Sequence, residues 1–195
     1  MSATLTDPKK MLLCHNLKVL RMPTMLAEYA KLSREAATAD ESYEQYLLRL
    51  SELEVAQRAS NALAARIKAA GFPVLKDLDS YDFSVMPSLP KQKILELSRG
   101  AWVEEKFNAC FIGNAGTGKT HVCIALGQAI CRAGKRVRFF TAAQLVNALE
   151  EAQKQYRLDR FLAGLDRIDL LIVDELGYLS FSRGGAELLF QVFAE

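Results

Sequence analysis

The chain has 195 residues, half of them hydrophobic, and its 25 basic and 23 acidic residues leave a net charge of +2. This length and apolar content suit one full domain with an appendage, or two small domains, and exclude a disordered polymer. No apolar run approaches the roughly 18 residues needed to cross a bilayer, and the N-terminus lacks a secretory signal. We therefore expect no membrane partner and a cytoplasmic location.

The first seventy residues show the apolar spacing and end signals of helices. Asp7 and Pro8 form an N-cap and first-turn pair, and a second, short helix is expected around residues 25–32. Ser42 and Gln45 form a capping box that opens a longer helix. We predict an all-helical N-terminal domain over residues 1–71, suited to binding DNA or a partner, followed by a linker over residues 72–100 that packs on the next domain.

Strands and helices alternate in the remaining domain, residues 101–195. The expected strands are residues 107–112, 135–140 and 170–173, and the expected helices are residues 119–132, a helix capped by Thr141 and Gln144, a shorter one that includes Phe161, and an amphipathic one near Leu188. Strands that are separated by helices form a parallel sheet flanked by helices. The chain is therefore predicted to be an α/β protein that is preceded by a small helical region.

A phosphate-binding loop lies between the first expected strand and the helix after it. Residues 113–120 read GNAGTGKT, which matches the P-loop pattern in full. Glycines let the backbone turn its N–H groups inward around phosphates, Lys119 reaches the β- and γ-phosphates, and Thr120 offers its hydroxyl to Mg²⁺. The predicted nucleotide-binding residues are Gly113, Asn114, Ala115, Gly116, Thr117, Gly118, Lys119, Thr120 and the adjacent His121. The expected cofactors are ATP and Mg²⁺, and Lys119 is also predicted to be catalytic.

Two carboxylates follow the apolar strand at residues 170–173. Ligands bind at the carboxyl ends of strands in open α/β sheets, so Asp174 is predicted to hold Mg²⁺ and Glu175 to polarise the attacking water as general base. A solvated acidic turn is the alternative for such a pair in isolation. The preceding P-loop favours the catalytic interpretation.

Several other residues are weaker candidates. Trp102 lies just before the first expected strand, where it could approach the nucleotide base, although packing is the simpler interpretation. Similarly, His121 is more simply a residue of the helix surface than a catalyst. Arg183 could reach a neighbouring subunit or DNA, although a solvated loop residue is the simpler interpretation. The basic residues of the helical region are interleaved with glutamates and form no single stripe, which favours a solvated surface over a DNA-binding face.

The combination of these motifs resembles a known family. The segments GNAGTGKTH, IALGQAICRAGKRVRFFTAAQLV, DLLIVDELGYL and GAELLFQVF are similar to the IstB family of ATP-binding transposition helpers, which resemble DnaC-type helicase loaders. The likeness extends to LKVLRMPTM and AGFPVLKDLDSYDF, and so covers nearly the whole chain. The aspartate followed by glutamate also resembles the division of P-loop ATPases that contains the AAA+ proteins.

The resemblance implies an AAA+ ATPase that forms an ATP-dependent oligomer on double-stranded DNA and stimulates a partner transposase. Such cores resemble a five-stranded sheet, so three expected strands imply a core that is incomplete at its C-terminus, with impaired hydrolysis. A replicative helicase loader and a nucleotide-binding scaffold remain as alternatives, and the partner protein would distinguish them.

Overall fold

The computed structural model describes residues 7–79, 81–85, 89–177 and 182–194. The chain divides into two compact units, Met1–Ala62 and Leu63–Glu195. The division falls inside the long helix α3 (Tyr43–Ala70), whereas the helical region was expected to extend to residue 71. Each unit has its own packing and is described by itself.

The first unit contains α1 (Pro8–Val19), α2 (Pro23–Thr38) and the beginning of α3. The predicted caps are confirmed: Asp7 accepts a hydrogen bond from the amide of Lys9, and Ser42 and Gln45 bond each other's backbone amides at 3.2 Å. The second helix is longer than expected, because Pro23 occupies its first turn, where proline needs no amide partner, and starts the helix.

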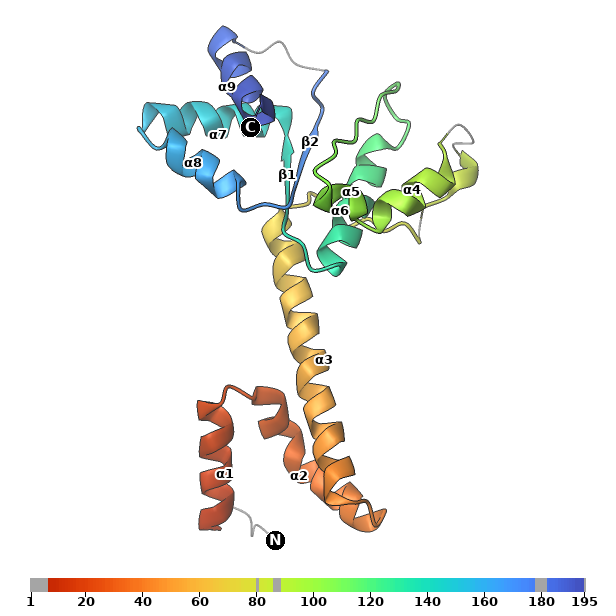
Figure 1. Ribbon diagram of the computed structural model, residues 1–195, viewed down its shortest axis with the longest axis vertical. Coiled ribbons are helices and arrows are strands. Elements are labelled where there is room, and N and C mark those ends of the chain that lie inside the picture. Colours follow the sequence, from red (N-terminus) through yellow and green to blue (C-terminus); the bar gives the residue numbers. More distant parts are fainter. Residues whose placement is uncertain (1–6, 80, 86–88, 178–181, 195) are drawn as a thin grey trace. The chain divides into compact units, whose positions relative to one another are not determined.

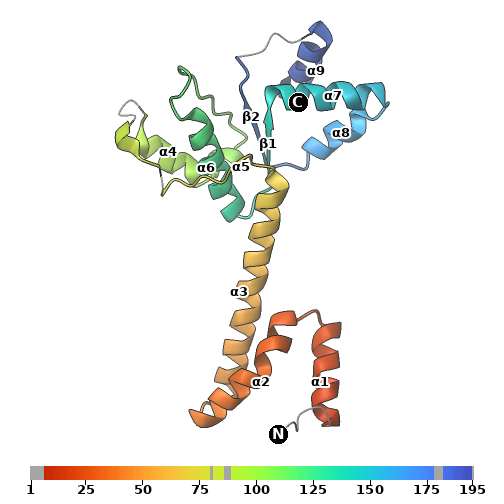
Figure 2. The ribbon, with the colours of Figure 1, turned by 180° about the vertical axis from the view of Figure 1, so that it is seen from behind.

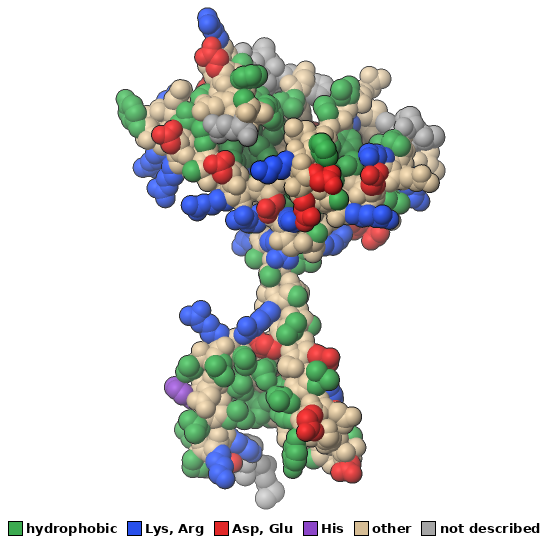
Figure 3. All heavy atoms as spheres, viewed as in Figure 1, with side chains coloured by type: hydrophobic (Ala, Val, Ile, Leu, Met, Phe, Trp, Pro, Cys, Tyr) green, Lys and Arg blue, Asp and Glu red, His purple; other side chains and the backbone are tan. Residues whose placement is uncertain are grey.

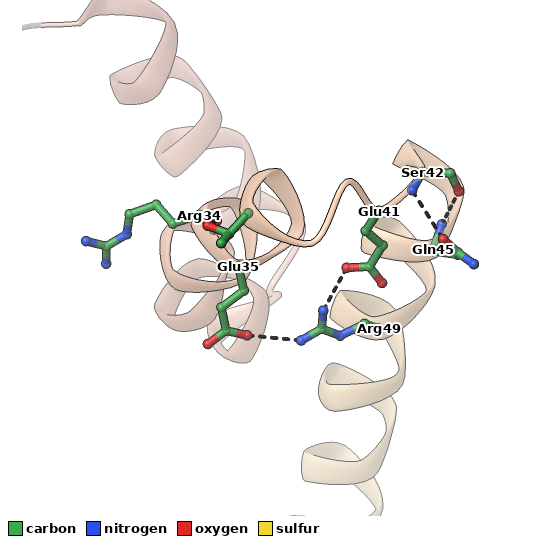
Figure 4. A network of polar contacts seen from close by, with 7 residues as sticks. Arg34, Glu35, Glu41, Ser42, Gln45 and Arg49 are labelled. Carbon is green, nitrogen blue, oxygen red and sulfur yellow. Dashed lines mark hydrogen bonds and ion pairs between the residues drawn. The ribbon is translucent and has the colours of Figure 1, made fainter.

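An arginine connects the end of α2 to the beginning of α3. Figure 4 shows the guanidinium of Arg49 between two carboxylates, with Glu41 at 2.7 Å and Glu35 at 3.0 Å. Ser42 and Gln45 lie beside this group at the start of α3. Arg49 and Glu35 are both partly exposed, and solvent weakens such pairs, so this network orients the turn more than it stabilises the fold.

A buried carboxylate supports the first turn of α2. Glu54 accepts hydrogen bonds from the amides of Thr24 at 2.8 Å and Met25 at 3.0 Å. These amides have no partner within their own helix, so a carboxylate there satisfies them and interacts favourably with the helix dipole. Arg58, one turn further along α3, neutralises Glu54 at 2.8 Å.

The second unit is built on two parallel strands, β1 (Val137–Thr141) and β2 (Leu170–Asp174), with Val137 opposite Leu170 and Thr141 opposite Asp174. Its helices are α4 (Lys91–Ser98), α5 (Ala101–Glu104), α6 (Lys119–Arg132), α7 (Ala142–Lys154), α8 (Leu158–Leu165) and α9 (Arg183–Ala194), with a short 3₁₀ helix at Phe83–Val85. Figures 1 and 2 show α6 on one side of the strands and α7, α8 and α9 on the other. This arrangement confirms the predicted α/β class.

Apolar residues fill both sides of the strand pair. On the α6 side, Ile124, Ile130 and Phe139 form a buried cluster against the last turns of α3. On the other side, Leu145 and Leu149 of α7 are fully buried against α8 and α9. Two packed layers therefore hold the strands, and the carboxyl ends of the strands lie beside the N-termini of α6 and α7.

The predicted strand at residues 107–112 is wrong. This segment is extended but forms no strand in the described part of the chain, where β2 pairs only with β1. Phe107 is 65% exposed and Ile112 is 92% exposed, and only Phe111 packs on a buried cluster, so the segment has no ladder partner and little apolar cover. An apolar run indicates a strand only when a neighbouring strand satisfies its backbone groups.

Among the described helices, none is long and apolar enough to span a membrane.

Candidate nucleotide site

The loop from Gly113 to Gly118 leads directly into α6, which begins at Lys119 as predicted. Gly116 and Gly118 have φ angles of +77° and +78°, a region that disfavours residues with a Cβ. Gly113 has no positive φ, so its conformation does not require glycine. The free amides and positive dipole end of α6 face the end of this loop, which makes an anion-binding cradle.

The loop is closed by its own side chains. The ammonium of Lys119 donates hydrogen bonds to the carbonyl oxygens of Gly113 at 2.8 Å and Asn114 at 2.7 Å. The hydroxyl of Thr117 also donates to the Asn114 carbonyl, at 2.8 Å. The positive charge therefore lies across the mouth of the loop, where it can reach the oxygen atoms of a bound phosphate.

Thr120 and Asp174 meet at the carboxyl end of β2. The hydroxyl of Thr120 donates to Oδ2 of Asp174 at 2.6 Å, although the two residues are 54 positions apart in the sequence. A hydroxyl and a carboxylate at one point are ligands that Mg²⁺ accepts. No described residues form a protein-only cluster of three or more His, Cys, Asp or Glu ligands. Mg²⁺ is usually held by one or two protein groups together with substrate phosphates and water.

Glu175 has a strained backbone next to this pair. Its φ angle is +63°, and its amide donates to Oδ1 of Asp174 at 3.0 Å. A non-glycine residue in this region costs of order 1–3 kcal/mol and is often found at functional sites. The Glu175 side chain is exposed beyond the end of β2, where solvent and a ligand can both reach it.

An aromatic contact that sequence reasoning missed lies against the loop. The hydroxyl of Tyr81 is 3.1 Å from the position that a Cβ on Gly118 would occupy, and the Tyr81 ring packs edge-on against His121, with centroids 4.9 Å apart. Nε2 of His121 is 3.4 Å from the carbonyl oxygen of Asp77. Tyr81 belongs to the segment interpreted as a linker, and the aromatic pair Tyr81 and Phe83 was the signal for a packed role there.

The other weak candidates lie in ordinary packing or surface contacts. The indole of Trp102 donates to the carbonyl oxygen of Leu97 at 2.8 Å. Arg183 is almost fully exposed and pairs with Glu187 on α9.

A cysteine also lies close to the site. Burial, together with the carboxylate of Asp174, raises the pKa of the Cys123 thiol to about 12. Cys123 is therefore protonated at neutral pH and acts as an apolar filler.

Comparison with known proteins agrees with this geometry. Residues 15–195 match the family model of the IstB-like ATP binding proteins. The chain is 34% identical over 181 residues to a protein named for ATP binding in insertion sequence IS5376 of Geobacillus stearothermophilus, covering 93% of this chain and 71% of the relative. It is 34% identical over 182 residues to the corresponding protein of IS21 from Pseudomonas aeruginosa, covering 91% and 69%. A third relative, from IS232 of Bacillus thuringiensis, is 30% identical over 177 residues.

Proposed function

Because the chain belongs to the family of IstB-like ATP-binding proteins, we propose that it hydrolyses ATP as a helper of insertion-sequence transposition. In this role it assembles on double-stranded DNA in an ATP-dependent oligomer and stimulates a transposase in the cytoplasm. The hydrogen bond of 2.6 Å between Thr120 and Asp174 carries the nucleotide part of the proposal. It joins the phosphate loop to the acidic strand end, which is the arrangement that a magnesium nucleotide requires.

The residues divide the chemistry between them. The loop amides and Lys119 bind the phosphates, and Thr120 and Asp174 hold the metal ion. Glu175, beyond the end of β2, orients the attacking water and accepts its proton as general base. Magnesium-bound ATP supplies the phosphoanhydride bond that is cleaved, while the protein contributes position and charge.

The link between ATP and DNA follows from general principles. A net charge of +2 gives one subunit weak attraction to DNA, so contacts must be summed across several copies. A nucleotide can drive this assembly only if it binds the assembled state more tightly than the free one. Names of the relatives in insertion sequences support a transposase as partner over a replicative helicase.

Two substitutions test this proposal. Lys119→Ala should abolish ATP binding measured by calorimetry, because it removes the charge across the loop, and should also abolish the ATP-dependent mobility shift of duplex DNA. Glu175→Gln should retain both and lose ATP turnover. Lys93→Ala is the matched control, since Lys93 is exposed and, among the described residues, pairs with Glu96 at the surface. Equal ATP affinity for wild type and Lys119→Ala would refute the nucleotide site.

The partner is tested separately. Purified protein with ATP should stimulate DNA strand transfer by a transposase from the same genetic element. Capture of a replicative helicase, together with no stimulation of the transposase, would replace the helper by the helicase loader.

A further inference from the structure

A groove of about 830 Å³ lies in the second unit, away from the phosphate loop. It is lined by the start of β1, the end of α3, the second half of α7, and α8. The phosphate loop meets Asp174 at the opposite end of the strand pair. Across the five residues of β1, a rise of about 3.3 Å per residue separates the two ends by about 13 Å. The groove is therefore distinct from the nucleotide site.

The charged side chains of the groove are mainly arginines. Five arginines and one carboxylate belong to its lining, and no lysine does: Arg66, Arg136, Arg138, Arg157, Arg160 and Glu151. They come from four separate segments of the chain, so only the fold brings them together. Figure 3 shows Lys and Arg side chains gathered over and below α8 in this unit.

Four of the five arginines form no ion pair among the described residues, and two of these four are oriented by backbone carbonyl groups. The guanidinium of Arg66 donates to the carbonyl oxygen of Cys131 at 2.9 Å, and that of Arg138 donates to the carbonyl oxygen of Ala69 at 2.7 Å. These acceptors carry no formal charge. Within the described part of the chain, Arg157 and Arg160 form no ion pair, and Arg136 alone of the five has one, a partly exposed contact of 3.5 Å with Asp169.

The floor of the groove is apolar. Phe161 and Leu165 of α8 and the following Ile168 line the same groove as the arginines and are partly buried. Apolar walls exclude water and lower the local dielectric constant, so each guanidinium attracts an anion more strongly than it would on an open surface. Concentrated positive charge is unfavourable by itself, and a bound polyanion relieves this repulsion.

The chemistry of arginine identifies the anion. A guanidinium presents a planar fork of N–H donors that bonds two phosphate oxygens at once. We propose that this groove binds the phosphate backbone of double-stranded DNA, which deepens the proposed function and rests on it. Because contacts with phosphates carry no base information, binding at this groove is independent of DNA sequence.

The test removes charge from the exposed rim of the groove in the full chain. Arg157→Gln with Arg160→Gln should weaken binding of a 30-base-pair duplex roughly tenfold or more in the presence of ATP, measured by fluorescence anisotropy across a salt series. The slope of log affinity against log salt should fall by about 1.8, or about 0.9 for each lost phosphate contact. Arg157→Lys with Arg160→Lys retains the charge and should keep most of the salt slope.

The matched control removes the same charge elsewhere in the unit. Arg99→Gln with Arg132→Gln, two exposed positions outside the groove lining, should leave DNA affinity within about threefold of wild type. Calorimetric ATP affinity, which should be unchanged in every variant, shows that the nucleotide site is folded.

The possible results separate the groove from the proposed function. If wild type binds DNA and the groove variant binds it equally well with the same salt slope, the groove proposal is wrong and the helper function stands. Normal DNA binding by the groove variant with loss of transposase stimulation would assign the groove to an acidic polypeptide and also overturn the proposal. If wild type binds ATP but no DNA in any nucleotide state, both the groove proposal and DNA assembly fail.

Discussion

Alanine substitutions in the phosphate loop can separate backbone strain from steric overlap. Gly116 and Gly118 share nearly the same positive φ, but a Cβ on Gly116 meets no atom within 4 Å, whereas one on Gly118 lies 3.1 Å from the hydroxyl of Tyr81. Gly113 has an ordinary φ, and its Cβ would make a normal contact of 3.5 Å with the Thr117 hydroxyl. The three glycines therefore form a graded series within one motif.

The geometry sets the expected magnitudes. An L-residue in the left-handed region costs roughly 1–2 kcal/mol. If the loop moves to relieve this strain, its amides no longer converge on the phosphates, so the cost appears as weaker ATP binding. At about 1.4 kcal/mol for each factor of ten, Gly116→Ala should weaken ATP binding about 5- to 30-fold. Gly118→Ala should weaken it more, because Tyr81 must also shift.

The assay is isothermal calorimetry of Mg²⁺-ATP binding, with circular dichroism to confirm that each variant is folded. Gly113→Ala should remain within about twofold of wild type, since neither strain nor overlap opposes it. In Gly118→Ala, the additional change Tyr81→Phe removes the overlapping hydroxyl and should restore affinity to the level of Gly116→Ala only. Equal ATP affinity for Gly113→Ala and Gly116→Ala, or full recovery in the double variant, would refute the role of the φ angles.

Three further predictions concern packing, pH and thiol reactivity. Gly127→Val should destabilise the protein by about 1–3 kcal/mol in urea unfolding, because a Cβ there would lie 2.7 Å from Cδ1 of Ile172. Unchanged stability would contradict this close packing of α6 against β2. Hydrogen bonds from Arg58 and the α2 amides lower the pKa of Glu54 despite its burial, so its contribution to stability is present above pH 4.5 and lost as the pH falls further. Glu54→Gln should therefore make the melting temperature less sensitive to acid. An unchanged dependence of the melting temperature on pH would contradict this role of Glu54. At pH 8, maleimide should label the exposed Cys110 in the folded protein and leave Cys123 unlabelled, as measured by mass spectrometry. Rapid labelling of Cys123 would contradict its raised pKa.

The local signals of the sequence were sufficient for most helices. The capping boxes at Ser42 and Thr141 and the helix start at Lys119 were predicted and are present in the structure. Each depends on residues within a few positions of one another, so the amino-acid order alone determines it. The phosphate loop is also determined locally, because its glycines, lysine and threonine lie at fixed positions within eight residues.

The segment at residues 107–112 shows the limit of such signals. Its apolar residues predicted a strand, but a strand depends on hydrogen bonds to a neighbour that the segment itself cannot supply. Within the linker predicted at residues 72–100, nothing local to Tyr81 indicates which atoms its hydroxyl contacts, and only the fold places it against Gly118.

The sequence by itself determined the chemistry of the phosphate loop and the ends of most helices, because these depend on neighbours along the chain. Only the tertiary structure decided that Thr120 meets Asp174 across 54 positions, and that five arginines from three segments line one groove. Both depend on how α6, β1, β2 and α8 pack. Hydrophobic burial drives that packing without regard to separation along the chain, so a pattern within a few residues cannot specify it.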